Sequence, residues 1–434
     1  MKFLTWFRKF EKPLLLAVLF TTPSSLVYSQ SIYTDKDGNF SPQTLSIPYG
    51  FYNEDMGLTA AWVYGLSGGP QKQSTVLGTV MIGSEGAAMI TLLGSDLKLP
   101  STERWFVDPM FNASFVSDTD VYTSGNPNFP NEQAGSNDSS VDNFVAGEVT
   151  DLHIRSRFKY LVPIGSGRDE IIQTIKIDNG FPVGLKTNPN SLNFMENGRT
   201  YFEAVPFYRN MSLDNNTNSG DLKTNGLEFN ISWDNRDFRP NPTVGHSITG
   251  KTAHDFGWFD SNDSWDSFSL EIDKYFSFET SDKWRQNTLA FDAWTAFSPS
   301  WDNDNGTITH RPPSYAGPHL GGLWRMRAYP SQRFSDRAAI YYSAEWRLTP
   351  EWNPFDNFPT LQEYIGVEWI QFVPFVEVGR VAPKYDLNDL HKDMKFSGGF
   401  GIRAWAKGIV VRMDIATSEE STGIQMMISQ PFQF

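Results

Sequence analysis

Apolar and polar residues alternate along most of this chain. In one segment, Phe268, Leu270 and Ile272 fall on one face, and Glu271 and Asp273 fall on the other. A period of two is typical of a β-strand. Segments of about ten residues repeat this alternation to the end of the chain, and stretches rich in Gly, Pro, Asn and Asp separate them. The pattern therefore predicts an all-β protein.

The segments number sixteen, an even number like that of single-chain bacterial outer-membrane barrels. We expect strands at residues 57–66, 73–83, 86–95, 102–115, 149–163, 169–178, 199–211, 226–234, 245–257, 264–278, 284–298, 337–349, 365–380, 394–405, 408–417 and 423–434. Alternation alone also fits a soluble β-sandwich or barrel. So many strands would enclose a lumen too wide for side chains to fill. This favours a 16-stranded antiparallel transmembrane β-barrel, with lipid outside and a charged lumen inside.

Two long insertions interrupt the strands. Residues 117–147 are rich in Asp, Asn, Ser and Gly, which indicates a mobile loop, and residues 300–336 are rich in Pro, Gly and Arg. Barrels of this class have long outside loops and short periplasmic turns. Both insertions are therefore expected on the outside, and the second could fold back into the lumen.

The N-terminus has the features of a secretory signal peptide. Residues 1–12 include four basic residues, residues 14–20 are apolar, and small residues precede a cleavage site after Ser29. A membrane anchor is the alternative, but the apolar run is shorter than the roughly 20 residues that a spanning helix needs. We expect a signal peptide at 1–29, a short periplasmic segment at 30–55 and the barrel at 56–434.

Composition narrows the chemistry. Aromatic residues make up 15% of the chain, a surplus that the aromatic belts of a membrane barrel would use. The chain has no cysteine, which excludes disulfides and thiolate zinc sites. Its net charge of −14 makes it a poor binder of nucleic acids.

The last segment ends on an aromatic residue. Ile424, Met426, Ile428, Phe432 and Phe434 share one face of this expected strand. Such an end resembles the C-terminal signal by which bacterial barrel proteins are recognised for insertion. An exposed strand edge can be read by strand addition, so Phe432 and Phe434 are the expected insertion signal, and the assembly machinery is an expected partner.

Several spaced motifs resemble those of the BamA/TamA superfamily, also called the bacterial surface antigen family. Met326, Arg327, Ala328 and Tyr329 match its V/I-R-G-F/Y loop tip, with Ala for Gly. The segment from Phe375 through Glu377 to Gly379 resembles its F-x-D-x-G strand motif, with Glu for Asp. Further matches are Asp234 to Asp237, with Pro242 and Gly245, to a D-x-R-D…P-x-x-G hairpin, and Gly399 to Arg403 to a G-x-G-x-R strand.

The resemblance implies a long loop folded into the lumen. In the family, the loop arginine pairs with the acid of the strand motif. The resemblance therefore implies an ion pair between Arg327 and Glu377, which inward-facing positions on the strand would allow. It also implies an outer-membrane location, with outer-membrane lipids as partners.

The resemblance to assembly factors is incomplete. About 27 residues separate Ser29 from the first expected strand, too few for a POTRA domain, so a separate periplasmic partner could supply that function. A role in outer-membrane biogenesis or maintenance, acting on proteins or lipids through a lateral seam, is the leading hypothesis. A loop-plugged channel or a passive surface barrel is the alternative.

Signals for catalysis are weak. The segment Gly65 to Gly69 matches G-x-S-x-G, but that motif needs a strand-to-helix elbow and here lies between two expected strands. The segment Asp302 to Gly306 resembles the start of a calcium loop but lacks the late Glu. We therefore expect no enzyme, no metal site and no cofactor.

Overall fold

The structure of the chain is a computed structural model that describes residues 30–53, 56–185, 191–215, 219–304 and 307–428. The expected signal peptide and the expected insertion signal at Phe432 and Phe434 lie outside the described residues. No helix among the described residues is long and apolar enough to cross a membrane.

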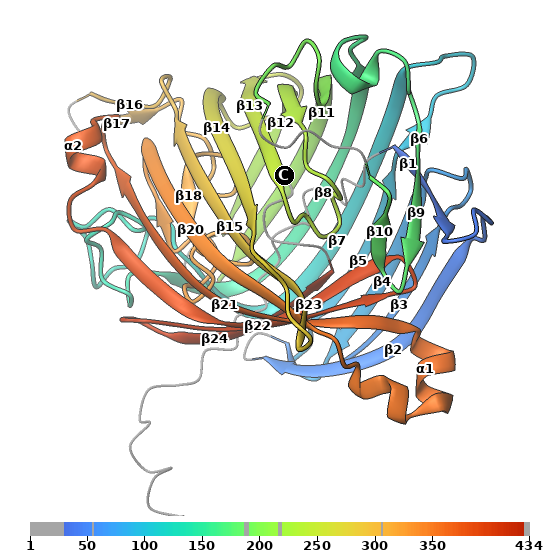
Figure 1. Cartoon of the computed structure of the whole chain (residues 1–434). Coiled ribbons are helices and arrows are strands. Elements are labelled where there is room, and N and C mark those ends of the chain that lie inside the picture. The colour runs from blue at the N-terminus through green and yellow to red at the C-terminus, as the bar shows by residue number, and fades with distance from the viewer. Residues whose placement is uncertain (1–29, 54–55, 186–190, 216–218, 305–306, 429–434) are drawn as a thin grey trace, which may run out of the picture.

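One large antiparallel sheet dominates the chain, and Figure 1 shows it curving round an interior, called the lumen below. Its strands are β2 (Gln43–Asn53), β3 (Gly57–Ser67), β4 (Thr75–Gly83), β5 (Ala88–Ser95), β6 (Leu97–Lys98), β7 (Trp105–Val121), β8 (Val145–Leu161), β11 (Arg199–Asp214), β12 (Ser219–Asp234), β13 (Gly245–Phe256), β14 (Ser264–Ser277), β15 (Trp284–Phe297), β20 (Ala338–Pro350), β21 (Val367–Ala382), β22 (Lys395–Ala406), β23 (Ile409–Ser418) and β24 (Thr422–Ile428). Each long strand pairs with the next in chain order, and the short β6 also pairs with β7.

Shorter elements fill the connections. They are β1 (Ser31–Asp35), β9 (Gln173–Asp178), β10 (Phe181–Val183), β16 (Asp302–Asp304), β17 (Thr307–Thr309), β18 (His319–Leu320), β19 (Phe334–Ser335), the 3-10 helices Gly165–Gly167 and Pro354–Asn357, and the short helices α1 (Pro359–Ile365) and α2 (Leu387–Leu390).

The faces of the large sheet are inverted relative to a soluble protein. On β14, Phe268, Leu270 and Ile272 are 40–50% exposed, whereas Glu271 and Asp273 are buried. Other strands repeat this arrangement, with exposed Trp, Phe, Ile and Leu outside and buried Arg, Lys, Asp and Glu inside. An apolar outer face over a charged lumen suits a sheet surrounded by lipid and argues against the soluble alternative.

The sheet begins earlier than expected. Residues 43–53, assigned from the sequence to a periplasmic segment, form β2, which pairs along its length with β3. Leu45, Ile47, Tyr49 and Phe51 alternate with other residues, but Pro48 and Gly50 are of types that are uncommon within strands, so the segment does not look like a strand. The first strand of the sheet is therefore β2, and not the segment starting at residue 57.

The expected sheet strand at 169–178 is wrong. Its core, β9, pairs in parallel with β1 and antiparallel with β10, forming a separate three-stranded sheet. Ile175 of β9 packs against Trp369 and Trp405 on the inner face of the large sheet. The small sheet lies in the connection between β8 and β11. Its apolar side chains pack on these two indoles, so it covers the lumen at that end of the large sheet.

The two long insertions meet each other. The first insertion, residues 117–147, is expected from the sequence to be a mobile loop, yet Ser139 accepts hydrogen bonds from Arg333 through its backbone oxygen, at 2.6 Å, and its hydroxyl, at 2.9 Å. The Ser335 backbone N–H also donates to the Gly135 oxygen at 2.7 Å. The first insertion is thus packed over the second, which turns back into the lumen.

Candidate functional site: a loop held inside the lumen

Residues 321–333, called the lumen loop below, form a compact turn inside the large sheet. β18 and β19 pair at its base, with Leu320 opposite Phe334. At Gly321 the backbone has a φ of 107°, and a Cβ there would lie 2.1 Å from the Pro330 oxygen. Only glycine fits such a position, so Gly321 is required for the backbone turn at the base of the loop.

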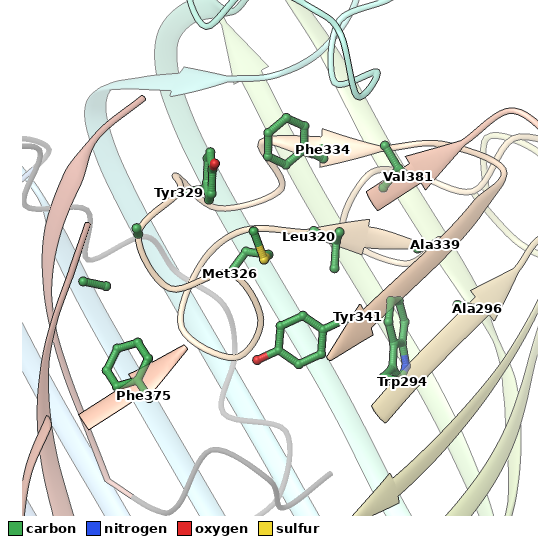
Figure 2. Packing of buried hydrophobic residues seen from close by; sticks show 12 residues of the cluster. Trp294, Ala296, Leu320, Met326, Tyr329, Phe334, Ala339, Tyr341, Phe375 and Val381 are labelled. Atoms are coloured by element: carbon green, nitrogen blue, oxygen red, sulfur yellow. The ribbon is translucent and has the colours of Figure 1, made fainter. Parts of the chain in front are cut away.

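Apolar side chains anchor the lumen loop to three strands. Figure 2 shows Met326 and Tyr329 of the loop among side chains of β15, β20 and β21, including Trp294, Tyr341 and Phe375. Met326 and Tyr329 have no solvent exposure. Burial of large side chains of this kind contributes roughly 1.5–3 kcal/mol each. The loop is therefore part of the packed interior.

Arg327 lies at the centre of a buried charge network. Its Nε is 3.0 Å from Glu377 Oε1, and its Nη1 is 3.0 Å from both Glu345 Oε1 and Asp414 Oδ2. The guanidinium also lies 3.5 Å from the ring centroid of Phe375. Burial alone would lower the pKa of Arg327, but the three carboxylates raise it well above its usual range.

Other strands complete the network. Glu345 of β20 also binds Arg347 at 2.8 Å and Arg403 at 2.7 Å, and Asp414 binds Arg412 at 3.1 Å. These side chains are 0–1% exposed. Breaking one partner of a buried ion pair costs about 3–5 kcal/mol because a charge is left uncompensated. The arrangement therefore fixes the loop relative to β20, β21, β22 and β23.

The pair of Arg327 and Glu377 implied by the family resemblance is present. Glu377 Oε2 also accepts the backbone N–H of Arg327 at 2.7 Å and the hydroxyl of Ser397 at 2.7 Å. Sequence reasoning missed Glu345 and Asp414 as partners of this arginine. Alternation marks both as inward-facing, but it carries no information on their depth in the lumen.

The glycines of the matched motifs make room for this network. A Cβ on Gly379 would lie 2.8 Å from Leu320 Cδ1, so this position lets the base of the loop approach β21. A Cβ on Gly399 would lie 2.6 Å from Phe375 Cζ, and one on Gly401 would lie 2.3 Å from Asp414 Oδ1. At the loop tip, Met326 takes the left-handed conformation, with a φ of 59°. Ala328 is absent from the left-handed positions, so the Gly of the family motif is not required there.

The hairpin motif at Asp234 is also built around an ion pair. Asp234 Oδ2 lies 2.8 Å from Arg236 Nη2 and also pairs with Arg239. Gly245 closes the turn with a φ of 106°, where a Cβ would lie 2.7 Å from the Asn235 oxygen. The residues of this motif therefore form the turn between β12 and β13, and ion pairs of Asp234 stabilise it.

The backbone of the lumen loop also accepts hydrogen bonds from the C-terminal edge of the sheet. Gln425 Nε2 of β24 donates to the backbone oxygens of Gly322, at 3.0 Å, and Arg327, at 2.6 Å. Ser421 donates to the Ala328 oxygen at 2.6 Å. The loop thus supports the last strands from the inside.

No protein-family model matches the sequence, and neither does any curated protein. Among solved structures, CdiB from Escherichia coli is similar, with 9% identity over 89% of this chain and 61% of that chain and a TM-score of 0.52. CdiB from Acinetobacter baumannii has 11% identity over 89% of this chain and 59% of that chain, with a TM-score of 0.49. BamA from Haemophilus ducreyi lacking POTRA domains 1–3 has 12% identity over 90% of this chain and 70% of that chain, with a TM-score of 0.46. The match thus spans about three fifths of each CdiB chain, and the fold of this chain is similar to that of CdiB from Escherichia coli.

Proposed function

We propose that this chain is an integral protein of the bacterial outer membrane that closes as a sixteen-stranded barrel, counting β5 and β6 as one strand. We further propose that it acts in outer-membrane biogenesis or maintenance, by opening a seam between β2 and β24 to incoming protein strands or lipids. The observation that carries this proposal is a difference between the two sides of the seam. Buried contacts with the lumen loop hold the β24 side, whereas β2 is an edge strand paired with β3.

Among the described residues, no β-ladder joins the two edges of the sheet. Over residues 43–53 and 422–428, β2 pairs with β3 and β24 pairs with β23, and no described residue of β2 forms a ladder with β24. Side chains connect the two sides instead, since Leu45 of β2 and Ile409 of β23, the strand next to β24, belong to one apolar cluster. Backbone groups at an unpaired edge in lipid cost several kcal/mol each, which an incoming strand would offset.

The α1 helix contacts the same edge. Tyr364 donates its hydroxyl hydrogen to the Ser46 oxygen of β2 at 3.0 Å. A single exposed hydrogen bond contributes about 0.5–1.5 kcal/mol, so it can break without unfolding the sheet. The lumen loop, by contrast, contacts β20, β21 and β23 through buried ion pairs and β24 through the hydrogen bonds of Gln425. This supports a rigid C-terminal side and a releasable N-terminal edge.

A cross-link across the sheet ends tests the proposal. A Cβ on Gly65 of β3 would lie 2.6 Å from Ile409 Cδ1, so these positions are neighbours across the seam, and the double variant Gly65→Cys/Ile409→Cys is the cross-link to make. The chain has no cysteine of its own. We expect the oxidised variant to fail to restore exclusion of a large antibiotic in a deletion strain, and reduction to restore it.

The control cross-link lies within a continuous ladder. Ser269 of β14 and Ala296 of β15 are direct cross-strand partners, so Ser269→Cys/Ala296→Cys rigidifies a wall that the proposal does not require to move. Full complementation by the oxidised seam variant would overturn the proposed opening.

A gated channel is the second candidate, because the lumen contains a charged cavity of about 200 Å³. Arg155, Arg209 and Lys251 line it on the strand side, and Arg325 lines it on the loop side. Deleting residues 321–329 would open this space. A rise in planar-bilayer conductance on deletion, together with complementation by the oxidised seam variant, would favour the channel over the assembly role.

A further inference from the structure

Three acidic side chains of the lumen wall converge beside the lumen loop. Asp273 of β14 and Asp292 of β15 are direct cross-strand partners, and Glu271 precedes Asp273 on the same face. One carboxylate oxygen from each lies within 4.8 Å of the others. All three residues are at least nine-tenths buried, with exposures of 8% for Glu271, 4% for Asp273 and 3% for Asp292.

Asp292 has no hydrogen-bond donor for either carboxylate oxygen within the described part of the chain. A buried carboxylate without a partner is costly, because burial removes its hydration without replacement. Glu345, Glu377 and Asp414, the acids around Arg327, each pair with an arginine, whereas the described residues provide no such partner for Asp292.

The two neighbouring acids each leave one oxygen free. Glu271 Oε2 is held by Arg325 at 2.6 Å, and Asp273 Oδ2 lies 3.8 Å from Arg236 Nη1. Glu271 Oε1 and Asp273 Oδ1 accept no hydrogen bond among the described residues. Each arginine therefore lies beside one oxygen of its carboxylate. The other oxygens of Glu271 and Asp273, together with those of Asp292, could bind one ion.

We propose that Glu271, Asp273 and Asp292 bind a divalent cation of the calcium class. Such hard cations prefer oxygen ligands at about 2.3–2.6 Å, so ligand oxygens on one ion lie at most about 5 Å apart, which the spacing of this cluster allows. Calcium takes about 6–8 oxygen ligands, and water supplies those beyond the carboxylates. The charged cavity, lined by Glu271, Trp294 and Arg325, provides this water and a path for the ion.

Terbium luminescence tests the site. Tb³⁺ replaces calcium, and Trp294 lies two residues from Asp292 along the same face of β15, where it can sensitise the ion. We expect the full chain, purified in detergent and stripped with EDTA, to give saturable Tb³⁺ luminescence that Ca²⁺ displaces. Asp292→Asn, which preserves shape and removes charge, should weaken binding at least tenfold. Ca²⁺ should raise the melting temperature of the wild type but not that of Asp292→Asn.

A matched control separates this site from the acidic outer hairpin. Asp302 of β16 lies in the segment that resembles a calcium loop, so Asp302→Asn should leave the luminescence unchanged. Loss of the signal in Asp302→Asn, or wild-type binding by Asp292→Asn, would overturn the proposal. No saturable signal in the wild type would also overturn it.

Discussion

Arg327 of the lumen loop and Glu377 of β21 are joined twice, through the arginine Nε at 3.0 Å and through its backbone N–H at 2.7 Å. The second contact does not depend on the arginine side chain. Glu377 therefore holds the loop backbone directly, and Arg327 extends that hold to Glu345 and Asp414.

Removing the arginine should loosen the loop. Arg327→Ala leaves three buried carboxylates without their shared cation, and we expect a loss of about 3–5 kcal/mol in stability. The temperature of the heat-induced gel-mobility shift in detergent should fall clearly. Lys392→Ala is the control, since Lys392 pairs with Asp389 on the exposed surface, where such pairs contribute about 0–1 kcal/mol. An unchanged shift in Arg327→Ala would contradict this role.

The two partners should be strongly coupled. In a double-mutant cycle, Arg327→Ala/Glu377→Ala should be less destabilised than the two single variants combined, with a coupling of about 0.5–3 kcal/mol. The reason is that each single change leaves the charge of the other residue buried and without this partner, and the double change removes both charges. Chemical denaturation in detergent measures the four stabilities, and strict additivity would show that the contact carries no energy of its own.

The glycine of the strand motif should not tolerate a methyl group. In Gly379→Ala, the new Cβ would press on Leu320 and displace the loop base, at a cost of about 1–3 kcal/mol. Gly250→Ala on β13 is the matched control, because a Cβ there would meet only Ile231 Cγ2, at 3.7 Å. Limited proteolysis of residues 321–333 should accelerate in the first variant and not in the second.

The apolar outer face should reject charge. Leu270→Arg places a cation on the outside of β14, and an arginine facing lipid at the bilayer midplane costs about 2–4 kcal/mol. We expect less folded protein in the membrane fraction and a lower refolding yield into lipid vesicles. Phe259→Arg, at a 93% exposed turn position between β13 and β14, should behave like the wild type. Equal yields for both variants would argue against a lipid-facing β14.

Local alternation made most of the fold predictable, because the inward or outward direction of a strand residue is set by its neighbours in sequence. Alternation did not predict which strand a given segment pairs with. The β9 segment alternates like any barrel strand, yet its partner is the distant β1. The β2 segment also alternates, but it contains Pro48, a residue that sheets accept mainly at edges, and β2 is an edge strand.

The candidate site was predictable only in part for a similar reason. Motif resemblance implied the pair of Arg327 and Glu377. Glu345 and Asp414 meet the same arginine because strand stagger brings them to one depth, and no local pattern encodes that stagger. The cluster around Asp292 also depends on the register between β14 and β15.

The contacts of the lumen loop constrain the order of assembly. Arg327 lies 87 residues before Asp414, and Gln425 lies 98 residues after Arg327. The strands can pair progressively along the chain, but the loop can dock only after its late partners are in place, since long-range contacts carry a loop-closure cost. A partly assembled barrel would thus hold a hydrated, undocked arginine. Docking of Arg327 would then serve as an internal checkpoint that the last strands have joined.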